Sequence, residues 1–194
     1  MARAEDLAGI PDVSVDVVTT RSVLIYVAEK ARAFSAMHRV LRPGGRISLF
    51  EPINRLMFPE PDDRFFGYQM GGAIELAAKV KAVFAQSADR SAVQAMMGFD
   101  DRDLAGFAQA AGFERVHVEC HINLEPGSVM GSVSLQALLN GTPNPHAPTV
   151  REAIASALTE PEQRQFTAEL ERAFADRKPV RRMAAAYLVA QKSL

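Results

Sequence analysis

The composition is that of an ordinary globular chain. It has 194 residues, of which 48% are hydrophobic and 23% are charged, and its formal net charge is -1. Because the basic residues are scattered among acidic ones, neither a nucleic acid nor a membrane surface is an expected partner. No apolar run reaches membrane-spanning length and residues 1–6 lack the order of a signal peptide, so we expect a soluble, cytoplasmic protein. Cys120 is the only cysteine, which excludes an internal disulfide.

The first three predicted elements alternate between strand and helix. Residues 15–20 are rich in β-branched side chains and predict a buried, central strand, and residues 46–50 predict a second strand. Between them, residues 28–41 place apolar side chains at helical spacing and run into the helix stop at 42–45, Arg-Pro-Gly-Gly. A crossover of this length allows parallel pairing of the two strands, so the segment predicts a βαβ unit.

The middle of the chain predicts a loop followed by helices. Residues 54–72 combine prolines and glycines with aromatic side chains, a composition that indicates a loop or lid with exposed aromatics. Residues 73–84 carry an apolar stripe at helical spacing. A further helix begins at the N-cap Asp100, has Asp103 three residues later and ends at Gly112.

The last third of the chain predicts a strand, two helices and one ambiguous element. From Val116 to Leu124 apolar and polar residues alternate, which predicts a strand with one covered face onto which Cys120 points. Three prolines between 141 and 148 indicate a stiff connection. Two T-x-x-E capping boxes, at 149–152 and 159–162, each begin a helix. Residues 183–192 fit either a helix, because of their alanines, or a strand, because of Tyr-Leu-Val at 187–189.

Three phrases in the first 46 residues together resemble a known family. They are Pro-Asp-Val-Ser-Val-Asp-Val-Val at 11–18, Val-Leu-Ile-Tyr-Val at 23–27 and Met-His-Arg-Val-Leu-Arg-Pro-Gly-Gly-Arg at 37–46. In this combination they are similar to the small-molecule class I S-adenosylmethionine-dependent methyltransferases, especially the type 11 group that includes quinone-biosynthesis enzymes. The stretch from Asp103 to Phe113 also resembles the family's L-x-x-x-A-G-F element, so the resemblance extends over residues 2–125.

The resemblance implies an α/β fold with a partial Rossmann-like methyltransferase sheet. It assigns the predicted strands to positions four to seven of the family order, with a helical insertion before the last strand. We therefore expect a single, N-terminally truncated methyltransferase-like domain over 1–194, with a lid and helix region at 54–98 and the insertion at 126–180. The family's glycine-rich cofactor turn and the acid that follows it have no counterpart among these residues.

The resemblance also implies a set of cofactor-binding residues. Arg3, Ala4 and Glu5 correspond to the family's adenine-side segment, although Arg3 stands where an acid usually accepts from the adenine amino group, and an arginine cannot accept. At the end of the fourth family strand, residues 20–22 (Thr20, Arg21 and Ser22) correspond to the methionine side, with plain turn chemistry as the alternative. Arg21 is suited to a carboxylate, or else forms a surface salt bridge. Tyr26 joins this set and also fits the wall of an acceptor pocket.

A second set of residues is implied for the acceptor and for catalysis. Glu51 and Asn54 follow the fifth family strand and are expected to orient or deprotonate an acceptor, unless the carboxylate only braces the loop. The acceptor pocket is assigned to Phe66, Tyr68, Met70 and Asn144, with core packing or a rigid linker as the alternatives. No metal is expected: His117, Glu119 and His121 share a strand face, but a fourth ligand is not evident.

Two classes of function remain open from the sequence. The first is an enzyme that uses S-adenosylmethionine to methylate a small molecule. The second is a non-catalytic methyltransferase remnant that serves as a dimerisation or ligand-binding module. In either case the strand at 15–20 would lack its family partner, the first strand, so we expect something to cover that edge. The candidates are a second copy of this chain, which we favour, a separate chain, or a rearranged N-terminus.

Overall fold

The computed structural model describes residues 3–127, 134–143, 147–176 and 179–194. Its contacts divide the chain into two compact units, each with its own hydrophobic core. Unit 1 consists of Met1–Phe58, Arg90–Asn123 and Met183–Leu194, and unit 2 consists of Pro59–Asp89 and Leu124–Arg182. The segments predicted as the lid and helix region and as the helical insertion supply most of unit 2.

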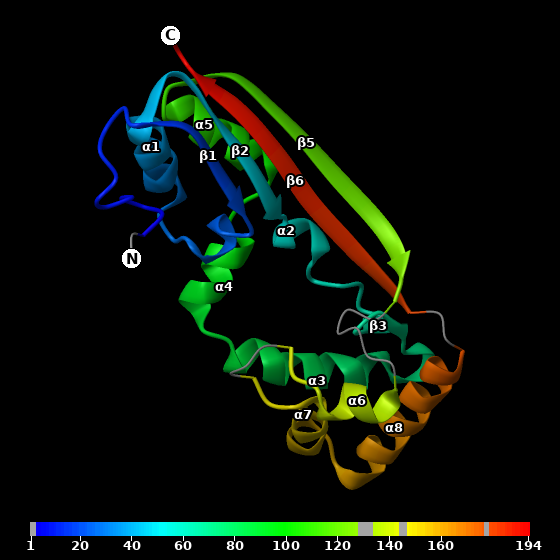
Figure 1. The fold of residues 1–194 in the computed structure, drawn as a ribbon. Coiled ribbons are helices and arrows are strands. Elements are labelled where there is room, and N and C mark those ends of the chain that lie inside the picture. Colours follow the sequence, from blue (N-terminus) through cyan, green and yellow to red (C-terminus); the bar gives the residue numbers. More distant parts are fainter. Residues whose placement is uncertain (1–2, 128–133, 144–146, 177–178) are drawn as a thin grey trace. The chain divides into compact units, whose positions relative to one another are not determined.

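A four-stranded mixed sheet is the main feature of the fold (Figure 1). Its strands are β1 (Val15–Arg21), β2 (Leu41–Pro52), β5 (Phe113–Pro126) and β6 (Val180–Lys192), in the order β1-β2-β6-β5. β1 is parallel to β2, and β6 is antiparallel to β2. The sheet order places β1 at an edge, so the prediction of a central strand was wrong for the described residues.

The predicted βαβ unit is confirmed by β1, α1 (Lys30–Val40) and β2. The stop at 42–45 ends the helix as expected, but these residues already belong to β2. Gly45 explains why the stop contains glycine: a Cβ there would lie 2.9 Å from the carbonyl oxygen of Arg42 and 3.0 Å from that of Asp16. β2 therefore approaches β1 closely at this point, where the register of the pair shifts between Val15 and Val17.

The core of unit 1 lies between one face of the sheet and two helices. Ile47, Leu49 and Leu188 project from the strands and are at most 3% exposed. They belong to one cluster with Phe34 and Met37 of α1 and with Leu104 of α5 (Asp101–Ala110). The shorter elements of unit 1 are the 3-10 helix η1 (Leu24–Tyr26), α2 (Asn54–Met57) and α4 (Arg90–Met97).

α5 begins and ends as its sequence predicts. The carboxylate of Asp100 accepts from the backbone N–H groups of Arg102 and Asp103, and Asp103 accepts in return from the Asp100 N–H, which completes a capping box. Gly112, which follows the helix, has φ +90, a conformation that glycine adopts without steric cost.

β5 does not bury the face that its alternation predicts. Val116 and Val118 pack against the core of unit 1, but Cys120 is exposed, Ile122 is 46% exposed and Leu124 is 70% exposed. The prediction of an inward Cys120 was therefore wrong. The reason is that β5 is longer than the core that covers it: the partly buried residues on this face stop at Val118.

Residues 183–192 form a strand, β6. Seven consecutive residues of β6, from Ala185 to Gln191, pair with Pro52–Arg46 of β2. The alanines that made the segment ambiguous, Ala184, Ala186 and Ala190, are at most 2% exposed and face the core. Their high helix propensity is overridden because the strand's backbone gains partners along β2 and β5.

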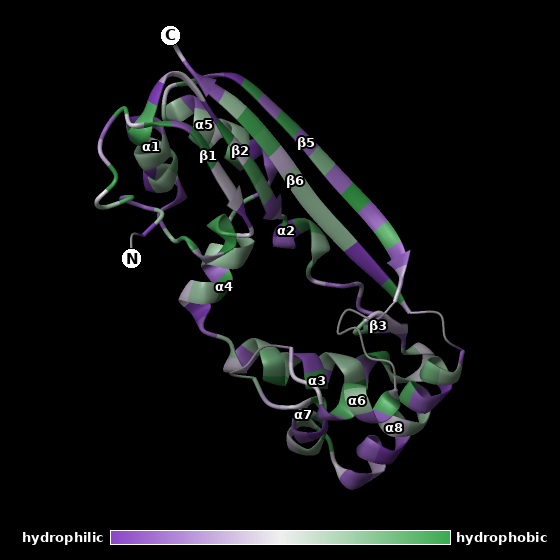
Figure 2. Cartoon of the chain, in the orientation of Figure 1, coloured by the Kyte–Doolittle hydropathy of each residue, from purple (hydrophilic) through white to green (hydrophobic). Residues whose placement is uncertain are grey.

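Unit 2 is mostly helical. Its elements are the hairpin strands β3 (Arg64–Phe65) and β4 (Tyr68–Gln69), η2 (Gly71–Ala73), α3 (Ile74–Ser87), α6 (Leu135–Asn140), α7 (Val150–Ala157) and α8 (Glu160–Ala175). Capping boxes at Thr149 and Thr159 begin α7 and α8 as predicted. The helical insertion before the last strand is thus present. The hydropathy colouring in Figure 2 shows α8 alternating between hydrophilic and hydrophobic residues, as expected for a helix that covers a core.

Of the aromatic residues of the predicted lid, Phe58 is 41% exposed as expected, but the expectation was wrong for Phe65 and Tyr68. Phe65 is 1% exposed and Tyr68 is 4% exposed. The carboxylate of Glu60 accepts from the N–H groups of Phe66 and Gly67 at 2.9 Å each and closes the turn of the hairpin. The hairpin then directs Phe65 onto Phe166 of α8, with ring centroids 5.2 Å apart. In the described part of the chain, no helix has the length and hydropathy needed to cross a membrane.

Candidate functional site

Three of the predicted cofactor residues, Thr20, Arg21 and Ser22, and the predicted catalytic residue Glu51 lie where β1 and β2 end. Because the two strands are parallel, their carboxyl ends share one edge of the sheet, the place where open α/β sheets bind ligands. Thr20 lies opposite Leu49 and Arg21 lies opposite Phe50. The Ser22 N–H donates to the Phe50 carbonyl at 2.8 Å and continues the pairing by one residue.

Glu51 is the organising residue of this edge. Its side chain has no exposed surface. Oε1 accepts from the Thr20 hydroxyl and from the Val23 N–H, both at 3.1 Å, and Oε2 accepts from the Leu24 N–H at 3.0 Å. These donors include the first N–H groups of η1, which the helix itself cannot pair. Glu51 thus joins the end of β2 to the loop that follows β1.

Burial raises the pKa of Glu51, and the hydrogen bonds from Leu24, Val23 and Thr20 oppose that rise. Burying the charged carboxylate costs free energy, and the hydrogen bonds from its three donors offset part of that cost. The structure supports the bracing alternative for this residue, because both oxygens are already occupied by the loop. A direct contact between Glu51 and an acceptor stays a prediction.

Asn54 lies three residues beyond Glu51, at the first position of α2. It is 7% exposed, and its carbonyl oxygen accepts from the Phe58 N–H at 2.8 Å. Its backbone therefore closes the single turn of α2. The acceptor role expected for its side chain is also still a prediction.

Lys30 is a buried cation that sequence reasoning missed. It begins α1, is 6% exposed, and donates through Nζ to the carbonyl oxygens of Val27 at 2.8 Å and Ala95 at 2.7 Å. Nζ also lies 4.8 Å from the centre of the Phe99 ring. Burial lowers the pKa of Lys30, and the charge of Glu51 opposes that fall. A lysine at a helix start gives no sequence signal of burial, because two of its neighbours, Ala95 of α4 and Phe99 just after it, are distant in the sequence.

Unlike the buried Glu51, two side chains at this edge, those of Arg21 and Tyr26, are exposed to solvent. Arg21 is exposed, and its guanidinium lies 5.1 Å from the centre of the Phe50 ring. Ser22 has φ +55, a left-handed conformation that is costly for a residue with a Cβ. Tyr26, at the end of η1, is 74% exposed. A cation, a hydroxyl and an aromatic ring are thus held by a loop that the buried Glu51 fixes.

The predicted adenine-side residues lie in an irregular segment before β1. Arg3 is exposed, and Ala4 and Glu5 are partly buried, with Ala4 packed against the core of unit 1. The Leu7 N–H donates to the Arg3 carbonyl at 2.8 Å, which closes a turn over these residues.

The predicted acceptor residues belong to unit 2. Tyr68 and Met70 are buried in its core, and Phe66 packs against the same core. Tyr68 stacks on Phe174 with ring centroids 5.0 Å apart. This is the core-packing alternative, and the acceptor role of these residues stays untested. Asn144 lies outside the described residues.

His117, Glu119 and His121 form an exposed row on β5. Glu119 bridges the two histidines, with Nε2 to carboxylate distances of 3.0 Å to His117 and 3.3 Å to His121. These hydrogen bonds lower the pKa of Glu119. Within the described ranges, no three His, Cys, Asp or Glu residues are grouped so that they could hold a metal ion.

Comparison with protein families matches residues 1–49 to a methyltransferase domain. Among curated proteins, a ubiquinone/menaquinone biosynthesis C-methyltransferase of Stutzerimonas stutzeri is 36% identical over 118 residues, covering 59% of this chain and 44% of the relative. The corresponding protein of Vibrio parahaemolyticus is 32% identical over 128 residues, covering 66% of this chain and 47% of the relative. The chain therefore spans less than half the length of these curated relatives.

Solved structures to which the chain is similar include a putative methyltransferase from Bacillus halodurans. It has a TM-score of 0.47 and 14% identity, and the match covers 100% of this chain and 76% of the other. A phosphoethanolamine N-methyltransferase from Haemonchus contortus, solved with S-adenosylhomocysteine, has a TM-score of 0.42 and 13% identity over 95% of this chain and 35% of the other. Over part of its length the chain is therefore similar to methyltransferases: residues 1–49 match a methyltransferase domain, and a longer stretch resembles ubiquinone/menaquinone biosynthesis C-methyltransferases.

Proposed function

We propose that the chain acts in S-adenosylmethionine-dependent methylation of a small molecule. In this proposal, the loop of residues 20–26 holds the cofactor's amino-acid end at the carboxyl ends of β1 and β2. The observation that carries the proposal is the buried Glu51, whose two oxygens accept from Thr20, Val23 and Leu24. A carboxylate with no exposed surface that fixes a strained loop next to an exposed arginine is a preorganised support for a ligand.

The side chains of the loop suit the amino-acid end of this cofactor. The guanidinium of Arg21 has five N–H donors in a planar arrangement that matches a carboxylate, and the Ser22 hydroxyl can donate or accept. The ring of Tyr26 is exposed and offers an apolar face. Bound at this place, the cofactor would supply an electrophilic methyl group on a sulfonium. The protein's contribution is then mainly orientation, because an in-line displacement needs few catalytic groups.

The acceptor in this proposal is a small, apolar molecule. The support comes from the two curated relatives, which are named as ubiquinone/menaquinone biosynthesis C-methyltransferases. On the protein side, Asn54 is the first polar residue that follows Glu51 in the sequence, and we assign it the task of orienting the acceptor. Glu51 acts in this scheme by positioning the loop.

A second candidate is a non-catalytic ligand-binding or dimerisation module. The observation that favours it is the position of β1, which ends the four-stranded sheet and leaves an edge for a second chain. An assay of methyl transfer distinguishes the enzyme from the module. Transfer of a radiolabelled methyl group from S-adenosylmethionine to a quinone precursor supports the enzyme, and binding without transfer supports the module.

Calorimetric titration with S-adenosylhomocysteine tests the proposed cofactor site. We expect a dissociation constant tighter than about 100 μM for the wild-type chain. Arg21→Met should weaken binding by roughly tenfold or more, since it removes a charge-assisted contact to the carboxylate. The matched control is Arg42→Met, because Arg42 is also exposed but pairs with Asp16 at 2.8 Å near the start of β1, away from the loop. Equal effects of the two substitutions, or no heat with the wild type, would contradict the proposal.

A further inference from the structure

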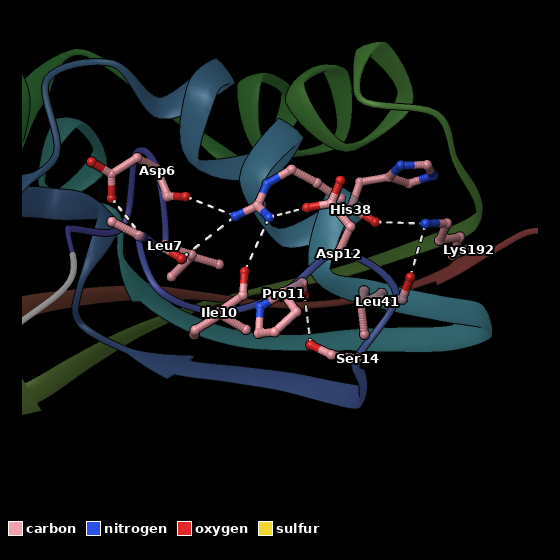
Figure 3. Close-up of polar contacts among 11 residues, drawn as sticks. Asp6, Leu7, Ile10, Pro11, Asp12, Ser14, His38, Leu41 and Lys192 are labelled. Carbon is pink, nitrogen blue, oxygen red and sulfur yellow. Dashed lines mark hydrogen bonds and ion pairs between the residues drawn. The ribbon is translucent and has the colours of Figure 1, made fainter.

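Arg39, near the end of α1, contacts the irregular segment that precedes β1. Figure 3 labels the residues of this segment that accept from it, which are Asp6, Leu7, Ile10 and Asp12. Its Nη1 donates to the Ile10 carbonyl at 3.1 Å and to the carboxylate of Asp12. Its Nη2 donates to the Asp6 carbonyl at 2.9 Å and contacts the Leu7 carbonyl at 3.5 Å. One guanidinium therefore reaches four positions of a seven-residue stretch, and three of its acceptors are backbone oxygens.

The same helix end binds the segment through its own backbone. The Val13 N–H donates to the Arg39 carbonyl at 3.0 Å, and the Ser14 N–H donates to the Val40 carbonyl at 2.8 Å. From β6, Nζ of Lys192 donates to the carbonyl oxygens of His38 and Leu41, both at 2.8 Å. The last carbonyl groups of α1, which lack partners within the helix, are thus used to anchor the segment and the end of the chain.

The segment needs such an anchor because its backbone is strained. Leu7 has φ +45 and Val13 has φ +52, left-handed conformations that are unfavourable for residues with bulky or branched side chains. Residues 3–14 form neither a helix nor a strand, so no regular pattern of hydrogen bonds holds them. Strained conformations persist only where the surroundings over-determine them, and they occur often at sites that hold a ligand.

A lysine could not take the place of Arg39. The acceptors lie in different directions around the guanidinium, and its five N–H groups in a planar fork address them together, whereas an ammonium is a single point charge. The ion pair with Asp12 contributes little by itself, since the Asp12 side chain is 67% exposed. The contacts to the partly buried carbonyl groups of Leu7 and Ile10 are therefore the important ones.

The strained segment leads directly to the residues assigned to the adenine side. Leu7, whose carbonyl contacts Arg39, also donates its N–H to the Arg3 carbonyl at 2.8 Å and so closes the turn that contains Ala4 and Glu5. We infer that Arg39 is the positioning residue of the adenine-side segment: it sets the conformation of residues 6–13 and through Leu7 that of residues 3–5. This inference rests on the proposed function, because only that function gives the segment an adenine to face.

Two ligands separate the role of Arg39 from that of Arg21. 5′-Methylthioadenosine contains the adenine and ribose but lacks the amino-acid end that S-adenosylhomocysteine carries. We expect Arg39→Met to lower the affinity for both ligands by the same factor, roughly tenfold or more. Arg21→Met should lower the affinity for S-adenosylhomocysteine and leave the affinity for 5′-methylthioadenosine unchanged. Arg42→Met, the control on the neighbouring exposed arginine, should change neither by more than about twofold.

A measurement without ligand tests the conformational part. In Arg39→Met, hydrogen exchange at the amides of Leu7, Ile10 and Val13 should accelerate at least about tenfold, while exchange at buried amides of β2 and β6 stays unchanged. Arg39→Lys should give an intermediate acceleration. Retained protection at the sheet amides also shows that the variants are folded, so that a change of affinity cannot be ascribed to unfolding.

The outcomes distinguish this inference from the proposed function. If the wild type binds neither ligand, the proposed function fails and the positioning role fails with it. If the wild type binds both ligands and Arg39→Met leaves the affinity for 5′-methylthioadenosine within twofold, the proposed function stands and the positioning role is wrong. Unchanged exchange at Leu7 and Ile10 in Arg39→Met would overturn the inference whatever the ligands do.

Discussion

Replacing Glu51 with glutamine should destabilise unit 1 more than its conservative chemistry suggests. The carboxylate accepts from the Thr20 hydroxyl, the Val23 N–H and the Leu24 N–H at 3.0–3.1 Å, and the side chain is wholly buried. A glutamine has one acceptor oxygen and turns an NH₂ group toward a donor. At least one buried N–H group therefore loses its acceptor, which costs about 1–3 kcal/mol. The neutral amide also avoids the desolvation that raises the pKa of Glu51, so we expect a net loss of about 2 kcal/mol.

Urea unfolding followed by far-UV circular dichroism measures this loss, from the shift in midpoint at an unchanged slope. Glu114→Gln is the matched control: Glu114 is exposed, accepts from the Ser193 hydroxyl at 2.8 Å, and should cost less than about 0.5 kcal/mol because an amide oxygen can replace that contact. Equal stability of the two variants would refute the reasoning that Glu51 holds the loop.

Three further predictions concern other parts of the chain. The hydrogen bonds from Lys79 and Thr159 lower the pKa of Glu162 from 4.5 to about 2, so its stabilising effect is complete above pH 4.5 and is lost as the pH falls toward 2. Glu162→Gln should therefore flatten the fall of the urea midpoint across this window, and an unchanged fall would contradict that assignment. Cys120 is exposed and should react with a disulfide reagent in the folded protein. The reaction should be slow near neutral pH, because partial burial of the thiol and the charges of Asp101 and Asp100 raise the pKa of Cys120. A thiol that reacts only after the chain unfolds would contradict the exposed position. A second copy should pair with the edge strand β1, where Val17 is 41% exposed, so light scattering should detect a dimer that Val17→Lys dissociates; a wild type that stays monomeric over a wide concentration range excludes this pairing.

Local patterns predicted the elements that are determined locally. The βαβ unit follows from apolar spacing between 15 and 50, and the capping boxes at Asp100, Thr149 and Thr159 mark the starts of three helices. The residues predicted for the cofactor at the end of β1 and Glu51, predicted for catalysis at the end of β2, also lie together, because the carboxyl ends of parallel strands share one edge. These features depend on interactions between residues that are close in the sequence, so the local sequence pattern is enough to predict them.

Features that depend on distant partners could not be predicted in this way. Phe65 of the predicted lid is buried because Glu60 closes a hairpin and α8 supplies Phe166, and neither contact can be recognised from the local sequence pattern. Cys120 is exposed because the core ends before it. Lys30 is enclosed by Ala95 and Phe99, which lie more than sixty residues away. In each case the local sequence pattern does not show which distant residues cover the side chain, or where that cover ends.

The most direct test of the account is to locate the ligand on the chain. Adding S-adenosylhomocysteine to the ¹⁵N-labelled protein should shift the amide resonances of residues 20–26 and of residues 3–7, while amides in the core of unit 2 stay unchanged. That pattern would place the ligand where β1 ends and on the segment that Arg39 holds. Shifts confined to unit 2, or none at saturating ligand, would contradict a cofactor site at the carboxyl ends of β1 and β2.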